Sequence, residues 1–392
     1  MPTHVYLIPG MFGFAQVASY TYFEHIARAL ERRFAQRGRS CRVFVCDVHP
    51  TASIRRRAVK LARTIHDTSG QGTGPIHIVG HSTGGLDARL LASPSVHLPG
   101  LTQAELAFMP RVRSITTMNT PHYGTPLAAF FATKSGQAML YAVMALTVTG
   151  LKLGAPPLAA ASALMAALGR VSGAIELSVI ERTSESIIKV LDDTSSRDLR
   201  AFLRLIRDDQ GAVIQLTPES MDLFQAAVEN CSSIRYQCVA SYAPRGGVKQ
   251  LLGSLTSPWS AVSAAIFTTM YNITATEDPR YPCHARTKHQ DESVRTLLAE
   301  LPVDTENDGV VPLYSQIWGD IVWIGRADHL DVVGHFPGRK GSGSDRHVDW
   351  LRSGAGFDET RFQTVMDRVF AGMILAEEAE DHAANAAAGA GG

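Results

Sequence analysis

The sequence is poor in features that would assign it to several classes of protein. Its 392 residues include only five cysteines: Cys41, Cys46, Cys231, Cys238 and Cys283. This small, odd number argues against a disulfide framework, and leaves one pairing to consider, Cys231 with Cys238, or free thiols. The formal net charge is zero. A chain without an excess of positive charge is not expected to have nucleic acid as its main partner.

Long apolar runs are also missing. A transmembrane helix needs about 18 or more unbroken apolar residues, and the most apolar stretch, 138–168, is interrupted by Lys152, Pro156 and Pro157. No signal peptide is recognisable, because Met1-Pro2-Thr3 leads directly into an apolar strand. We therefore expect no transmembrane span and a cytoplasmic protein, with secretion by a route independent of a Sec signal as the alternative.

What the sequence does contain is an alternation of strands and helices. We predict strands at His4–Ile8, Arg42–Asp47, Ile76–Val79, Ser114–Met118, Arg235–Ala240 and Ile321–Ile324, and helices at Thr21–Gln36, Ser53–Asp67, Leu86–Leu91 and Glu359–Leu375. This alternation is typical of a mostly parallel, doubly wound sheet. We expect one domain over residues 1–375, followed by a disordered tail, 376–392, that is rich in Ala, Gly and Glu.

A serine lies where one predicted strand gives way to a helix. The segment Pro75 to Arg89 reads PIHIVGHSTGGLDAR, and glycines stand two residues before and after Ser82. Small residues suit a strained elbow in which the backbones of strand and helix crowd together. The G-x-S-x-G pattern alone arises by chance in about one chain in ten of this size. Its context, a buried strand before it and a helix after it, favours Ser82 as a nucleophile.

Two partners for Ser82 lie near the other end of the chain. Asp308 occupies an Asn-Asp-Gly turn, and His329 follows the strand that ends near Ile324. A histidine has a pKa suited to removing the serine proton near neutrality, and a buried carboxylate fixes its tautomer. The chain order Ser, Asp, His differs from that of chymotrypsin-type and subtilisin-type hydrolases. The alternatives are a turn-forming role for Asp308 and a packing role for His329.

The loop after the first strand completes the candidate site. Pro9-Gly10-Met11 follows His4–Ile8, and its glycine lets backbone N–H groups face a ligand. We expect the N–H of Met11 to form an oxyanion hole with that of Thr83, the residue after the nucleophile. The alternative is an ordinary turn at the end of a strand.

Together these motifs resemble the bacterial triacylglycerol lipases and esterases of the α/β-hydrolase superfamily. The resemblance rests on the Pro9-Gly10-Met11 loop, the Gly80–Gly84 elbow, Asn119–Thr125, Leu216–Met221, the Asn307–Val310 turn and His329–Asp331. It implies an α/β-hydrolase fold and a carboxylic ester hydrolase that cleaves apolar or lipid-like esters through Ser82, His329 and Asp308, with no required cofactor. The chain departs from the family by having Pro9-Gly10 where His-Gly is usual. Acyl transfer, polyester hydrolysis and non-catalytic lipid binding are the alternatives.

The resemblance also gives meaning to three other features. The insertion 127–211 falls where lipases keep a cap or lid, and its two apolar helices, Ala138–Leu151 and Leu158–Leu168, suggest contact with lipid. Asp331 stands where the family has an acidic ligand of a structural calcium, with Asp278 and Asp291 as further candidates, or it anchors its loop by hydrogen bonds. Arg55, Arg56 and Arg57 form a basic run that we interpret as a solvated helix face. The alternative, which the resemblance implies, is that Arg57 braces the oxyanion loop.

Overall fold

A six-stranded parallel sheet forms the centre of the molecule. The computed structural model describes residues 2–11, 22–69, 72–137, 139–143, 200–246 except 202 and 205, 258–276, 278–299, 301–338 and 351–390. The strands are β1 (Thr3–Ile8), β2 (Cys41–Val45), β3 (Ile76–His81), β4 (Val112–Met118), β5 (Arg235–Tyr242) and β6 (Asp320–Arg326). All pair in parallel, in the order β2-β1-β3-β4-β5-β6. The predicted doubly wound sheet is confirmed.

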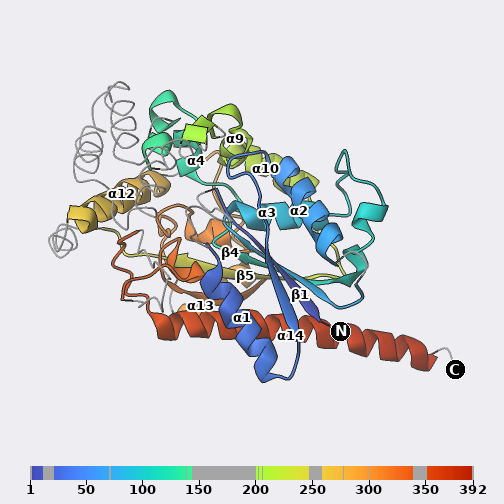
Figure 1. Cartoon of the computed structure of the whole chain (residues 1–392). Coiled ribbons are helices and arrows are strands. Elements are labelled where there is room, and N and C mark those ends of the chain that lie inside the picture. The colour runs from blue at the N-terminus through green and yellow to red at the C-terminus, as the bar shows by residue number, and fades with distance from the viewer. Residues whose placement is uncertain are drawn as a thin grey trace.

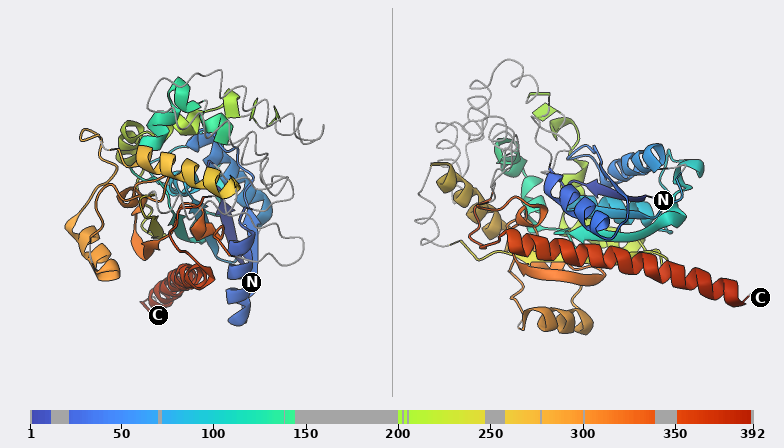
Figure 2. Two further views of the ribbon diagram at one scale, coloured as in Figure 1. Left: turned by 90° about the vertical axis from the view of Figure 1, so that its left-hand side faces the viewer. Right: turned by 60° about the horizontal axis from the view of Figure 1, so that its bottom comes forward.

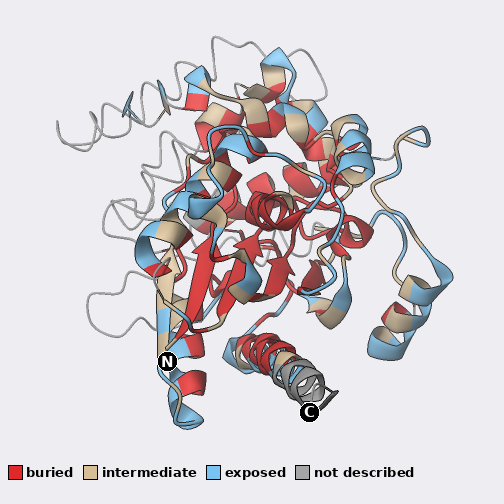
Figure 3. Cartoon of the chain, turned by 90° about the vertical axis from the view of Figure 1, so that its right-hand side faces the viewer, coloured by how far each residue is buried: buried red, intermediate tan, exposed pale blue. Residues whose placement is uncertain are grey.

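Helices cover both faces of this sheet (Figure 1). The long helix α14 (Glu359–Ala390) lies with α1 (Glu24–Gln36) against one face, and α2 (Ile54–Ser69) packs with α3 (Thr83–Ala92) on the other. Separate cores result on the two faces, because successive strand residues point to opposite faces. Val5 and Leu7 enter the core beneath α1 and α14, whereas Tyr6 and Ile8 enter the core beneath α2 and α3. The buried strands stand out in Figure 3.

The helices follow from the spacing of apolar residues. In α2, Ile54, Ala58, Leu61 and Ile65 recur every three or four residues and are all buried. This places them on one stripe of the helix, facing the sheet. In the same helix Arg55 and Arg56 are exposed, as expected for a solvated face, whereas Arg57 is buried.

Further helices are α4 (Pro126–Phe131), α9 (Gly211–Gln215), α10 (Pro218–Ala227), α12 (Pro258–Thr274) and α13 (Lys288–Leu298). Helix α4 contacts α9 and α12, whereas α13 packs against β6. The predicted insertion 127–211 begins inside α4, and Met139, Leu140 and Val143 from it are buried in the core on the α1 side. The rest of its first predicted helix, with Met144 and Val148, and its second lie outside the described residues. None of the helices that are described has both the length and the apolar character needed to cross a membrane.

The predicted disordered tail is wrong from its first residue. Helix α14 continues from the predicted end at Leu375 to Ala390, and the views in Figure 2 show it as one long rod. Glu377 is buried, lies 2.8 Å from Nε2 of His77 in β3, and forms an ion pair with Arg39. A composition rich in Ala and Glu is of low complexity but also favours helix, and here the contacts of Glu377 fix it to the sheet.

The disulfide considered between Cys231 and Cys238 does not form. Cys231 and Cys238 are both free thiols. Cys238 points from β5 into the core, where its Sγ lies 3.5 Å from the backbone N of Trp318. Cys231 stands in the preceding loop with its Sγ 3.2 Å from the hydroxyl of Ser233. The two side chains therefore occupy separate environments.

Candidate active site

Ser82 sits on a sharp turn between β3 and α3. Its backbone has φ 54° and ψ −128°, which is unusual for a residue with a side chain. The turn needs glycine on both sides: a Cβ on Gly80 would lie 2.4 Å from the backbone of Gly84, and one on Gly84 would lie 2.2 Å from the carbonyl oxygen of Ile8. Helix α3 therefore begins at Thr83, three residues before the predicted start at Leu86.

His329 and Asp308 are hydrogen-bonded side chains from two loops at the carboxyl edge of the sheet. The distance from Nδ1 of His329 to Oδ2 of Asp308 is 2.7 Å, and both side chains are buried. The backbone N–H of His329 also donates to the carbonyl of Asp308, at 3.0 Å. An ionised carboxylate only accepts hydrogen bonds, so Nδ1 carries the proton. Nε2 has no hydrogen-bond partner among the described residues and is left able to accept one.

The carboxylate of Asp308 is held by three further donors. Its Oδ1 accepts from the backbone N–H groups of Val310, at 2.8 Å, and Val311, at 2.7 Å. Its Oδ2 accepts from Nδ2 of Asn119 at 2.8 Å. Four donors thus surround a fully buried carboxylate, and each stabilises its charged form.

Asn119 contributes to the candidate site by binding the carboxylate of Asp308, a role that its sequence did not predict. It follows β4 directly and has φ 50°, a left-handed conformation that asparagine tolerates better than most residues. Its Nδ2 bridges Asp308 and the hydroxyl of Ser241, which lies 2.7 Å away on β5. Its signals in the sequence were its place at the end of a buried strand and its position as the first residue of the Asn119–Thr125 motif.

An apolar pocket opens beside Ser82. It is lined by Met11, Ser82, Thr83, Pro121, Thr125, Leu127, Ala128, Phe131, Leu216, Val310 and Val311. The two residues expected to form the oxyanion hole, Met11 and Thr83, thus lie in one pocket with the serine. Thr83 is the first residue of α3, and the first N–H groups of a helix have no partner within the helix. The first residue of the insertion, Leu127, lines this pocket as well, and so does Leu216, which follows its other end.

Arg57 is not part of the solvated face but braces the loop that carries Met11, which is the alternative that the resemblance implied. Its Nη2 donates to the carbonyl of Pro9 at 2.5 Å, and its Nη1 donates to the carbonyl of His49 at 2.7 Å. The same guanidinium pairs with Asp87 of α3 at 2.8 Å, with neither side chain exposed. Burial raises the pKa of Asp87 to about 6, against the opposing effect of Arg57. This buried pair ties the loop after β1 to the helix that follows Ser82.

The residues considered for calcium do not fit a metal site. Oδ2 of the buried Asp331 accepts from the backbone N–H of Asp328 at 2.9 Å, which is the loop-anchor alternative. Asp278 is held by Arg280 at 2.7 Å, and Asp291 by Arg286. Calcium needs six to eight oxygen ligands, and within the described ranges no three His, Cys, Asp or Glu side chains gather to hold a metal ion.

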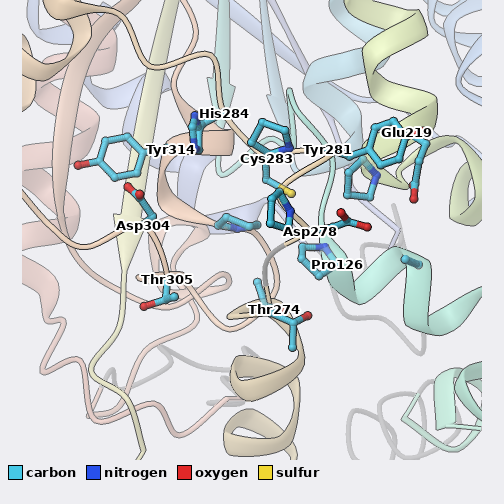
Figure 4. A pocket seen from close by; sticks show the side chains of 16 residues that line it. Pro126, Glu219, Thr274, Asp278, Tyr281, Cys283, His284, Asp304, Thr305 and Tyr314 are labelled. Atoms are coloured by element: carbon cyan, nitrogen blue, oxygen red, sulfur yellow. The ribbon is translucent and has the colours of Figure 1, made fainter.

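A second cavity, of about 330 Å³, lies beyond the wall of the Ser82 pocket (Figure 4). Pro126 and Pro312 face this cavity, while their neighbours Leu127 and Val311 face Ser82. The hydroxyl of Thr125 donates to the carbonyl of Val310 at 2.6 Å and joins the two sides of that wall. The carboxylates near the cavity are largely neutralised, since Asp278 pairs with Arg280 and Asp304 with Arg286. None of the predicted catalytic residues lines it.

Two curated lipases are similar to part of this chain in sequence. The chain matches no protein-family model. The triacylglycerol lipase of Pseudomonas fragi is 29% identical over 125 residues, which are 32% of this chain and 36% of the lipase. The triacylglycerol lipase of Vibrio cholerae serotype O1 is 30% identical over 125 residues, 32% of this chain and 34% of the lipase. The match thus spans about a third of the length of these curated relatives.

The fold is similar over a much longer stretch. The crystal structure of Staphylococcus hyicus lipase superimposes with a TM-score of 0.51 at 17% sequence identity, covering 97% of both chains. At this identity the likeness shows the fold. The chain therefore has the α/β-hydrolase fold, and two curated proteins similar to it in sequence are triacylglycerol lipases.

Proposed function

We propose that this protein is a serine carboxylic ester hydrolase that cleaves apolar or lipid-like esters. The observation that supports the proposal most strongly is the buried pair of His329 and Asp308, which leaves Nε2 of His329 as a base at the edge of the sheet where Ser82 stands on its strained turn. The triacylglycerol lipase relatives agree with it. The roles below follow from the chemistry of these groups.

In the first half of the reaction Ser82 would attack the ester carbonyl carbon while Nε2 of His329 takes its proton. The carbonyl oxygen becomes an oxyanion, which the N–H groups of Met11 and Thr83 would stabilise. Asp308 would stabilise the imidazolium that forms. Collapse of the intermediate breaks the bond to the alcohol oxygen, and the imidazolium returns its proton to the departing alcohol. The product is an acyl group on Ser82.

In the second half, water attacks the acyl-enzyme with His329 again as the base. The acid is released and Ser82 regains its proton. The residues that line the pocket beside Ser82 favour an ester with an apolar acyl group, because Leu127, Phe131 and Val311 offer no charged partner to a polar one.

An activity-based fluorophosphonate probe tests the nucleophile. We expect the wild type to be labelled on Ser82, and Ser82→Ala to lose labelling while hydrolysis of p-nitrophenyl butyrate falls by at least about 10³-fold, because only binding and the oxyanion hole remain. Ser232→Ala, at an exposed serine far along the chain, is the matched control and should label normally. Labelling of the Ser82→Ala protein would refute the assignment.

We further propose that the insertion 127–211 caps the site. Its support is that Leu127, Ala128 and Phe131 at one end, and Leu216 just beyond the other, line the pocket of Ser82. Opening an apolar cap in water costs about 25 cal/mol per Å² of surface exposed, and a lipid surface removes this cost. A p-nitrophenyl ester series should therefore show activity on long chains rising sharply above their solubility limit. Simple hyperbolic kinetics across that limit would indicate a fixed cap.

A further inference from the structure

The residue immediately before the candidate nucleophile is held in an unusual way. His81, the last residue of β3, is buried, and both nitrogens of its ring have partners. Nε2 lies 2.8 Å from the backbone carbonyl oxygen of His329, and Nδ1 lies 2.8 Å from the hydroxyl of Tyr22. Its ring also packs on that of His329, with centroids 4.6 Å apart.

These partners fix the tautomer of His81. A carbonyl oxygen only accepts hydrogen bonds, so Nε2 of His81 carries the proton and donates it. Nδ1 then accepts, and the hydroxyl of Tyr22 is its donor. Burial, followed by the nearby His329, holds the pKa of His81 well below its usual value, which keeps the ring neutral. A neutral ring with this tautomer satisfies both bonds at once.

The hydrogen bond from His81 adds a third contact that holds His329 in place. Its Nδ1 and its backbone N–H are both bonded to Asp308, and its carbonyl is bonded to His81. Asp308 fixes the orientation of the ring but lies on a different loop from Ser82. His81 is joined to Ser82 by one peptide bond, so its hydrogen bond is a direct tether between the strand that carries the serine and the residue that would act as base.

We propose that His81 is a positioning residue that sets the separation between Ser82 and His329, with Tyr22 fixing its tautomer. This rests on the proposed function, since it concerns the same site. His81 takes no part in proton transfer, because its only acidic proton is held by the backbone carbonyl of His329. Its contribution appears in the rate of acylation and not in the binding of ester, since it is absent from the lining of the Ser82 pocket.

Two amide substitutions at His81 distinguish the effect of its hydrogen bond to His329 from the effect of the size of its ring. Glutamine places an N–H near the position of Nε2, whereas asparagine reaches only the position of Nδ1. We expect His81→Asn to lower kcat for p-nitrophenyl butyrate by about 10–100-fold with little change in KM, because a displacement of about 1 Å at the reacting atoms costs about 10²-fold. The rate of fluorophosphonate labelling should fall by the same factor. His81→Gln should recover kcat to within about fivefold of the wild type.

A third variant and a pH profile complete the test. Tyr22→Phe keeps the ring and removes the donor to Nδ1, so we expect a smaller fall in kcat than in His81→Asn. The acid limb of kcat/KM against pH should persist in His81→Asn, because His329 remains the base. Tm, measured for every variant, identifies any loss of rate that follows unfolding.

Several results would overturn the inference. His81→Gln as slow as His81→Asn, with equal Tm values, would mean that the ring only fills space. Loss of the acid limb in His81→Asn would mean that His81 is itself the base. Normal kcat in His81→Asn, with wild-type labelling of Ser82 intact, would refute the tether and leave the proposed function standing. A wild type that neither hydrolyses esters nor reacts with the probe would refute the proposed function instead.

Discussion

Two buried aspartates, Asp308 and Asp328, lie in neighbouring loops but differ in the side chains that they bind. Each accepts two backbone N–H groups from the residues that follow it, Val310 and Val311 for Asp308, and Leu330 and Asp331 for Asp328. Their other oxygens differ. Oδ2 of Asp308 faces Nδ1 of His329 and the amide of Asn119, whereas Oδ2 of Asp328 accepts from the hydroxyl of Ser353, at 2.8 Å.

The difference shows that burial and turn geometry do not by themselves make a catalytic acid. Burial, with a further contribution from the nearby charge of Asp308, raises the pKa of Asp328 to about 7, against the effect of its hydrogen bonds. Asp308 has the same turn but gains an imidazole that can carry positive charge. One aspartate can thus stabilise an imidazolium, while the other anchors the loop that holds His329. Three variants sharpen this contrast.

The largest effect is expected at Asp308. Asp308→Asn keeps the shape of the side chain but favours the wrong tautomer of His329, so we expect kcat to fall by about 10³–10⁴-fold with Tm little changed. Asp304→Asn, at an exposed aspartate of the same loop, is the control and should leave kcat near that of the wild type. Equal losses in the two variants, measured with p-nitrophenyl butyrate, would refute the assignment of the acid.

A smaller effect is expected at Asn119. Asn119→Gly suits the left-handed backbone and removes only the amide, so Asp308 keeps three of its four donors. We expect kcat to fall by about tenfold, equivalent to about 1.4 kcal/mol in the barrier. Ser241→Ala removes the other partner of the amide and tests whether the bond to Asp308 is the one that matters. A glycine variant with unchanged kcat would show that Asn119 only closes the turn.

The smallest effect on activity, and a distinctive one on stability, is expected at Asp328. The pKa of Asp328 is about 7 in the folded state and about 3.9 in the unfolded state. Between these two pH values the unfolded chain loses the proton and the folded protein keeps it. The free energy of unfolding therefore falls as the pH rises from about 4 to 7. Asp328→Asn stays neutral and avoids that loss. Its Tm should match the wild type at pH 4 and exceed it by about 2–4 °C or more at pH 8. A constant difference across this range would contradict the raised pKa.

The sequence by itself determined the features that depend on neighbours along the chain. The alternation of strand-like and helix-like segments identified a doubly wound sheet, because this alternation is typical of parallel strands connected by helices. Gly80 and Gly84 identified the elbow around Ser82, because backbone crowding there permits no larger residue. The acidic turn at Asp308 was recognisable for the same reason, since its hydrogen bonds to Val310 and Val311 are local.

Only the tertiary structure decided which of these groups meet. Asn119 reaches Asp308 across 189 positions of sequence, and His81 reaches His329 across 248. Nothing local distinguishes either residue from an ordinary polar group at the end of a strand. The same holds for Glu377, whose bond to His77 spans 300 positions. This contact holds a segment that was predicted to be disordered as part of helix α14 against the sheet. Contacts at such separations depend on how parallel strands are ordered in the sheet, and that order is set by the packing of the whole core and not by any segment alone.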